Sequence, residues 1–85
     1  MNRIYTITVG ALEIKGLISP GELPNLKSDF NWLVSYYEAT MEVHENTLIA
    51  RKKDVEICLT IGEYHSAIPG KRVLQVLVHL MDEMF

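Results

Sequence analysis

The stretch from residue 37 to 61, YEATMEVHENTLIARKKDVEICLTI, alternates apolar and polar side chains over more than a quarter of the chain. Alternation of this kind is typical of β-strands that bury one face and expose the other. Two-residue turns at Glu45-Asn46 and Lys52-Lys53 would fold the stretch into a three-stranded antiparallel meander, the second turn placing Ala50 opposite Val55. Because opposed residues share a sheet face, the apolar side chains then lie together. The predicted apolar side carries Tyr37, Ala39, Met41, Val43, Leu48, Ala50, Val55, Ile57, Leu59 and Ile61, and the predicted polar side carries Glu38, Thr40, Glu42, His44, Ile49, Arg51, Glu56, Cys58 and Thr60.

The N-terminal segment repeats this pattern on a smaller scale. In YTITVGALEIK, a two-residue turn at Gly10-Ala11 pairs Val9 with Leu12 and Ile7 with Ile14. Glycine at the first central position is what a type II′ hairpin turn requires. The segment is therefore predicted to form a second hairpin, and SPGELPN after it a loop.

Two further segments are predicted to cover the apolar face. Residues 69–85 are predicted to be helical, because their polar side chains recur at helical spacing and the rest are mostly apolar. Residues 26–37 fit a short helix by the spacing of Leu26, Phe30 and Leu33, although their residue types also suit a strand. The expected fold is a single α+β domain over residues 1–85. It is a two-layer sandwich with a mostly antiparallel five-stranded sheet, in the order ββ(α)βββα, and the C-terminal helix packs on one face.

Composition narrows the classes of function. A net charge of −3 argues against a general nucleic-acid binder, whose surface is usually basic. A single cysteine, Cys58, excludes an intramolecular disulfide and suits a reducing compartment. The N-terminus lacks the apolar core of a signal peptide, and no apolar run is long enough to span a bilayer. A cytoplasmic protein is expected.

The sequence contains no recognisable catalytic or cofactor motif. His44, His65, His79 and Cys58 show none of the paired spacings of a zinc site, so no metal is expected. The Gly-Lys pair at residues 70–71 lacks the upstream glycine of a phosphate-binding loop. We therefore expect a protein that is not an enzyme and needs no cofactor.

Carboxylates and aromatic residues are the candidates for contacting a partner protein. Glu38, Glu42 and Glu56 are predicted to project from the polar sheet face, where they either remain solvated or meet a basic surface of a partner. Trp32 and Tyr36 are of the residue types favoured at protein interfaces. For Trp32, packing in the core is the more ordinary expectation.

The apolar stripe of the C-terminal helix is wide for a helix with one packing partner. A two-fold interface would bury the same patch from both copies, so a homodimer through Val76, Leu80 and Met84 is predicted.

The sequence favours a small non-enzymatic protein-binding module that acts through an acidic sheet face and a hydrophobic C-terminal helix. Inhibitors, adaptors and assembly subunits all fit, including a phage-type anti-defence inhibitor that occludes a nucleic-acid-handling enzyme. The alternative is a nucleic-acid-binding domain whose basic residues form one phosphate-binding patch. Its candidate residues are Arg51, Lys52, Lys53, Lys71 and Arg72.

Overall fold

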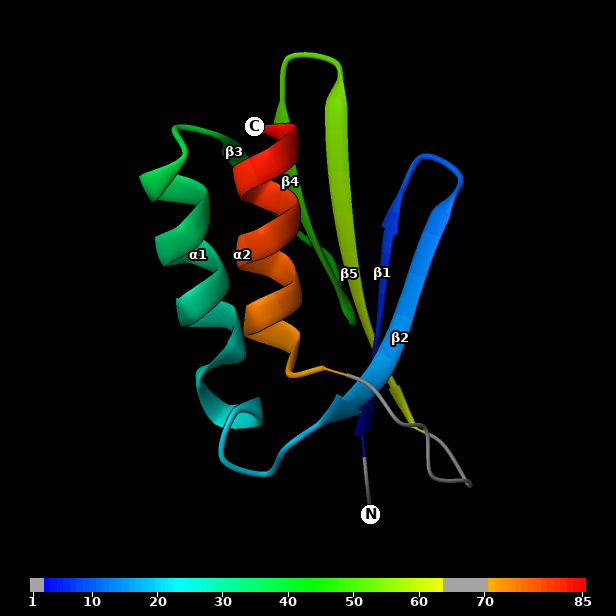
Figure 1. Cartoon of the computed structure of the whole chain (residues 1–85). Helices are drawn as coiled ribbons and strands as arrows, with labels where there is room; N and C mark the ends of the chain where they lie inside the picture. The colour runs from blue at the N-terminus through cyan, green and yellow to red at the C-terminus, as the bar shows by residue number, and fades with distance from the viewer. Residues whose placement is uncertain (1–2, 64–70) are drawn as a thin grey trace.

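The chain folds as an α+β sandwich of one open antiparallel sheet and one layer of helices, which confirms the expected fold class (Figure 1). The computed structural model describes residues 3–63 and 71–85. The strands are β1 (Arg3–Val9), β2 (Leu12–Ile18), β3 (Thr40–Val43), β4 (Thr47–Lys52) and β5 (Val55–Glu63), and the helices are the 3-10 turn η1 (Leu23–Asn25), α1 (Leu26–Tyr36) and α2 (Val73–Met84). The five strands lie in the order β2-β1-β5-β4-β3, so the N-terminal hairpin joins the meander through the β1–β5 pair.

The N-terminal hairpin has the predicted register. Val9 pairs with Leu12 and Ile7 with Ile14, and the chain reverses at Gly10-Ala11. Gly10 has a φ of +59°, whereas Ala11 has a negative φ. This agrees with the type II′ turn, which needs positive φ at its first central residue only.

The first turn of the meander is as predicted, and the second is not. Val43 pairs with Leu48 around Glu45-Asn46, but Ala50 pairs with Ile57 rather than with Val55. The second turn is therefore Lys53-Asp54, with Lys53 at a φ of +55°. Moving the turn by one residue shifts the pairing by two, and side chains alternate with a period of two. The predicted division into an apolar and a polar face consequently survives the error.

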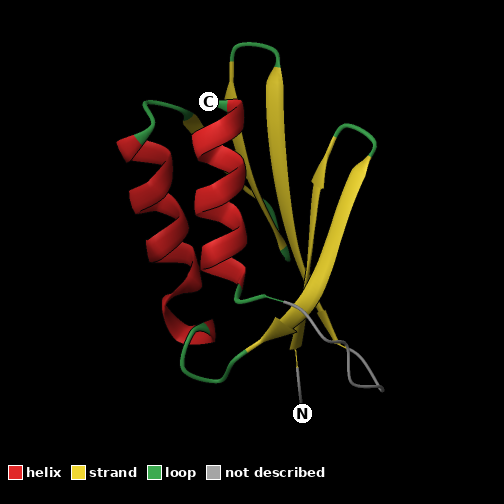
Figure 2. Ribbon diagram, viewed as in Figure 1, coloured by secondary structure: helices red, strands yellow, loops and turns green. Residues whose placement is uncertain are grey.

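Both helices cover the same face of the sheet, as Figure 2 shows. The helical interpretation of the segment after the loop is confirmed, because Leu26, Phe30 and Leu33 are buried at helical spacing. The core is completed by Val34 of α1, by the strand side chains on the covered face of the sheet and by one stripe of α2. These core residues are Tyr5, Ile7, Ile18, Val34, Leu48, Ala50, Ile57, Leu59, Val73, Val76, Leu77, Leu80 and Met81.

Tyr5 connects the first hairpin to the start of α2. Its ring lies over Gly16, the residue opposite it in β2, and its hydroxyl donates a hydrogen bond to the carbonyl of Lys71. A Cβ built on Gly16 would lie 2.7 Å from the ring atom Cε2, so no larger residue fits beneath the ring in this position. Burial, together with the nearby Glu22 carboxylate, raises the pKa of Tyr5.

Helix α1 ends in a Schellman motif with an unusual residue at its centre. Ala39 N–H donates to the carbonyl of Val34 and Glu38 N–H to that of Ser35, the two hydrogen bonds that define the motif. Glu38 occupies the left-handed position, at a φ of +57°, where glycine is usual. The prediction that Glu38 projects from the sheet is therefore wrong, since β3 begins only at Thr40.

Candidate functional site

The polar sheet face carries a compact ion cluster of Glu42, Arg51 and Glu56 on the adjacent strands β3, β4 and β5. Arg51 Nε donates to Glu56 Oε2 at 2.8 Å, and Nη1 donates to Glu42 Oε1 at 3.2 Å. The hydrogen bond from Arg51 lowers the pKa of Glu56. Both carboxylates already have a cationic partner within the chain, and the cluster has a net charge of only −1. This face therefore offers a partner much less negative potential than three free glutamates would.

Cys58 lies beside this cluster on β5. Its thiol is 3.5 Å from Glu56 Oε1, and burial first, then the neighbouring carboxylate, raises its pKa. Because the thiolate is the reactive form, this environment disfavours nucleophilic chemistry at Cys58.

The structure separates the basic residues of the predicted patch into two groups. Arg51 is held by the two glutamates, and Lys52 Nζ donates to the carbonyl of Tyr37 at 2.8 Å. Lys53 sits in the β4–β5 turn, which lies at the end of the molecule opposite the start of α2 (Figure 1). Lys71 and Arg72 precede α2 at that other end.

The second basic group is itself partly neutralised. Arg72 Nε lies 3.6 Å from Oε1 of Glu22, a buried carboxylate that also accepts a hydrogen bond from Ser19 at 2.8 Å. A nucleic-acid backbone would require a continuous row of free cations. The described surface carries no such row.

The residues predicted to mediate self-association divide between core and surface. Val76 and Leu80 are only 7% and 4% exposed and belong to the core, and the little of them that is exposed lies at the bottom of a concave surface between α2 and β2. Met84, at the end of α2, is exposed. The apolar stripe of α2 is wider than its contact with the core because it also contains Leu74 and the 43% exposed Val78.

Aromatic side chains form a continuous row across the helical layer. Trp32 and Tyr36 are stacked one helical turn apart on α1, with ring centroids 5.4 Å apart and planes inclined by 14°. Tyr36 meets Tyr37 edge to face at 5.0 Å, and Tyr37 meets Phe85 at 6.5 Å. We call Trp32, Tyr36, Tyr37 and Phe85 the aromatic row.

The two leading members of the aromatic row are mostly exposed. Trp32 is 63% and Tyr36 is 66% accessible, so the expectation that Trp32 packs in the core is wrong. The reason is their place on α1: Leu26, Phe30, Leu33 and Val34 form its buried stripe, and the two aromatic residues lie outside it. Exposing two large rings in stacked contact leaves an unusual amount of apolar surface in water.

The aromatic row borders a shallow hollow between the two helices. The hollow has a volume of about 250 Å³ and is lined by Trp32, Leu33 and Asp29 of α1 and by Leu74 and Val78 of α2. Of these, Leu74 and Val78 were missed in the sequence. They could have been found as the apolar residues of α2 that fall outside the stripe facing the sheet.

Within residues 3–63 and 71–85, no three histidine, cysteine or acidic side chains gather as a metal site would require. His44 and His79 each lie near one glutamate, Glu42 at 3.6 Å and Glu83 at 3.3 Å, and His65 lies outside the described residues. Neither helix is long and apolar enough to cross a bilayer.

Comparison of the chain with protein-family models, with curated proteins and with solved structures finds no match.

Proposed function

We propose that the chain is a small protein-binding module whose contact surface is the helical layer around Trp32 and Tyr36. The observation that carries the proposal is the stacked pair itself, two large aromatic side chains that are both more than 60% exposed. Tryptophan and tyrosine are the residues in which interface binding energy concentrates, because they bury a large area at a low cost in side-chain entropy. Val78 and the hollow beside it extend the apolar surface on α2.

The charges around the row suit a protein partner. Asp29 lines the hollow, and Asp82 accepts a hydrogen bond from the Tyr37 hydroxyl at 3.4 Å, so acidic groups flank the rings. An apolar centre with a polar rim is the usual anatomy of an interface between proteins. An inhibitor, an adaptor and an assembly subunit would all bury this surface against a partner protein.

The test is capture of a partner from the native host by tagged protein, compared between the unchanged chain and matched variants. Trp32→Ala and Tyr36→Ala are expected to weaken capture about thirtyfold each, the loss typical of an interface hot spot of about 2 kcal/mol. Both positions are exposed, so the variants should keep the fold, which circular dichroism verifies. The control is Thr60→Ala, an exposed residue on the opposite sheet face.

Equal capture by all four proteins would refute the proposal. So would a partner lost on Glu42→Gln or Glu56→Gln but retained by Trp32→Ala, because binding would then use the polar sheet face. A partner that is nucleic acid rather than protein would restore the alternative function.

A further inference from the structure

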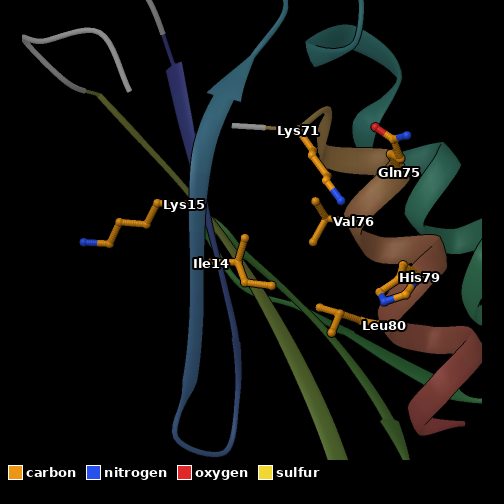
Figure 3. Close-up of a pocket in the computed structure, with 7 residues that line it drawn as sticks. All are labelled: Ile14, Lys15, Lys71, Gln75, Val76, His79 and Leu80. Atoms are coloured by element: carbon orange, nitrogen blue, oxygen red, sulfur yellow. The ribbon is translucent and has the colours of Figure 1, made fainter. Parts of the chain in front are cut away.

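A second concave surface lies on the other flank of α2, between this helix and strand β2. It has a volume of about 420 Å³. Figure 3 shows Ile14 of β2 facing Val76 and Leu80 of α2, with Lys71, Gln75 and His79 along the helix side. We call this surface the β2–α2 groove. Its floor is apolar and its helix rim is polar.

The groove is open because the N-terminal hairpin leans away from α2 toward its turn, as Figure 1 shows. Ile14 is only half-buried, and Leu12, two residues nearer the turn on the same face, is 46% exposed. Apolar residues of β2 therefore remain uncovered by any described part of the chain.

Strand β2 is also an edge of the sheet, with seven residues against four in the opposite edge strand β3. Residues that flank a two-residue hairpin turn form a hydrogen-bonded pair, and such pairs then alternate along the ladder. Leu12, Ile14 and Gly16 thus direct their backbone groups toward β1. The N–H and C=O groups of Glu13, Lys15 and Leu17 point outward, where no described strand pairs with them.

Lys71 gives the groove a local positive charge in a protein whose net charge is −3. Lys71 and His79 lie on its rim, and Lys15 lies at its mouth with the side chain turned away in Figure 3. None of the described residues that line it is a carboxylate. Lys71 has no acidic partner within 4 Å among the described residues, whereas Lys15 and His79 lie 3.5 Å and 3.3 Å from Glu13 and Glu83. Lys71 is the cation left to meet a carboxylate from outside.

We propose that the β2–α2 groove binds an extended segment of another protein, which adds to β2 as a sixth strand. The unpaired edge supplies backbone hydrogen bonds, and strand addition is an established way of binding peptides. Alternate side chains of the bound segment would point into the groove and should be apolar, to meet Ile14, Val76 and Leu80. A glutamate or aspartate of the segment would pair with Lys71.

This inference is independent of the function proposed above, because the two surfaces use different flanks of α2. Leu74 and Val78 face the hollow beside α1, and Val76 and Leu80 face β2. A chain that used both surfaces could hold two partners at once.

The experiment selects random heptapeptides, displayed on phage, against the immobilised full-length chain. Enriched sequences should alternate apolar residues with polar ones and contain an acidic residue. The best peptide is then synthesised with a fluorescent label and titrated by anisotropy. Lys71→Glu should weaken its binding at least about tenfold, the loss expected for one charge-assisted hydrogen bond.

Two further variants separate strand addition from simple adhesion. Lys15→Pro removes one outward N–H from an edge strand that tolerates proline, and should reduce binding much more than Lys15→Ala, which removes only the charge. In an added strand, every second backbone N–H of the peptide faces β2. Methylating those nitrogens should abolish binding, whereas methylating the nitrogens between them should not. Trp32→Ala should leave the affinity unchanged, so failure here and failure of the proposed function can be told apart.

The proposal is overturned if no peptide is enriched, or if the enriched peptide binds the Lys15→Pro and Lys71→Glu variants as tightly as the unchanged chain. It is also overturned if light scattering shows a dimer that Lys15→Pro dissociates, because the edge would then be occupied by a second copy.

Discussion

Replacing Gly16 by alanine should destabilise the fold, although alanine is normally the better residue in a strand. The added Cβ would lie 2.5 Å from the Tyr5 hydroxyl oxygen and 2.7 Å from ring atom Cε2, and Tyr5 is fully buried. Forcing the ring aside costs about 1–3 kcal/mol as overpacking. Losing its hydrogen bond to the Lys71 carbonyl costs about 1 kcal/mol more. The gain from removing a glycine is only about 0.5–1 kcal/mol, so a net loss of about 1–3.5 kcal/mol is expected.

The matched control is Gly62→Ala, because Gly62 also lies within a strand. Among the described residues, a Cβ there meets only Ile4 Cγ1, at 3.9 Å, which is an ordinary contact. This variant should be neutral or gain up to about 1 kcal/mol. The free energy of unfolding is measured by urea titration followed by circular dichroism, with melting temperature as a second readout that shifts by about 4–8 °C per kcal/mol.

A third variant isolates the cause. In a Tyr5→Leu background the ring is gone, so adding Gly16→Ala should cost much less than it does alone, and the difference measures the coupling between the two residues. Equal effects of Gly16→Ala and Gly62→Ala would refute the reasoning. An unchanged cost of Gly16→Ala in the Tyr5→Leu background would show that the clash is not with the ring.

Three other predictions each concern the surroundings of one position. Glu38→Gly should raise the free energy of unfolding by up to about 1 kcal/mol in urea titration, because glycine suits the left-handed position at the end of α1; a loss of stability would contradict the Schellman assignment. Val76→Asp should unfold the chain, whereas Val78→Asp should cost less than about 1 kcal/mol in thermal melting. If both variants melted alike, the assignment of the buried stripe would be wrong. Cys58 should react with iodoacetamide at mildly alkaline pH more slowly than a cysteine peptide, since burial and then Glu56 raise the pKa of its thiol, and an equal rate would count against that environment.

The sheet could be predicted from sequence because strand register affects burial so strongly. A slip by one residue would have put Leu48 and Ile57 in water, so the alternation left a single acceptable division into faces. A slip by two carries no such penalty. This is why the position of the second turn was predicted wrongly, at Lys52-Lys53, while the faces were predicted correctly.

The candidate surface was harder to predict because it depends on where two helices sit on the sheet. The width of the apolar stripe on α2 indicated that some of its residues face away from the core. The sequence pointed to Val76 and Leu80, which the structure buries. Which residues of the stripe stay exposed depends on the rotation of the helix, and contacts with the sheet decide that rotation. The pairing of Arg51 with Glu42 and Glu56 was not predicted either, since it depends on the exact register of β3, β4 and β5.

The most direct test of the account is collisional quenching of Trp32, which is the only tryptophan in the chain and so reports on the aromatic row alone. The measurement uses iodide, at a concentration where light scattering reports a monomer and circular dichroism a folded chain. With Trp32 63% exposed, emission should resemble that of a water-exposed indole, and iodide should quench it nearly as efficiently as in the urea-unfolded chain. A blue-shifted emission that iodide hardly quenches in the folded monomer would place the indole inside the protein and remove the basis of the proposed function.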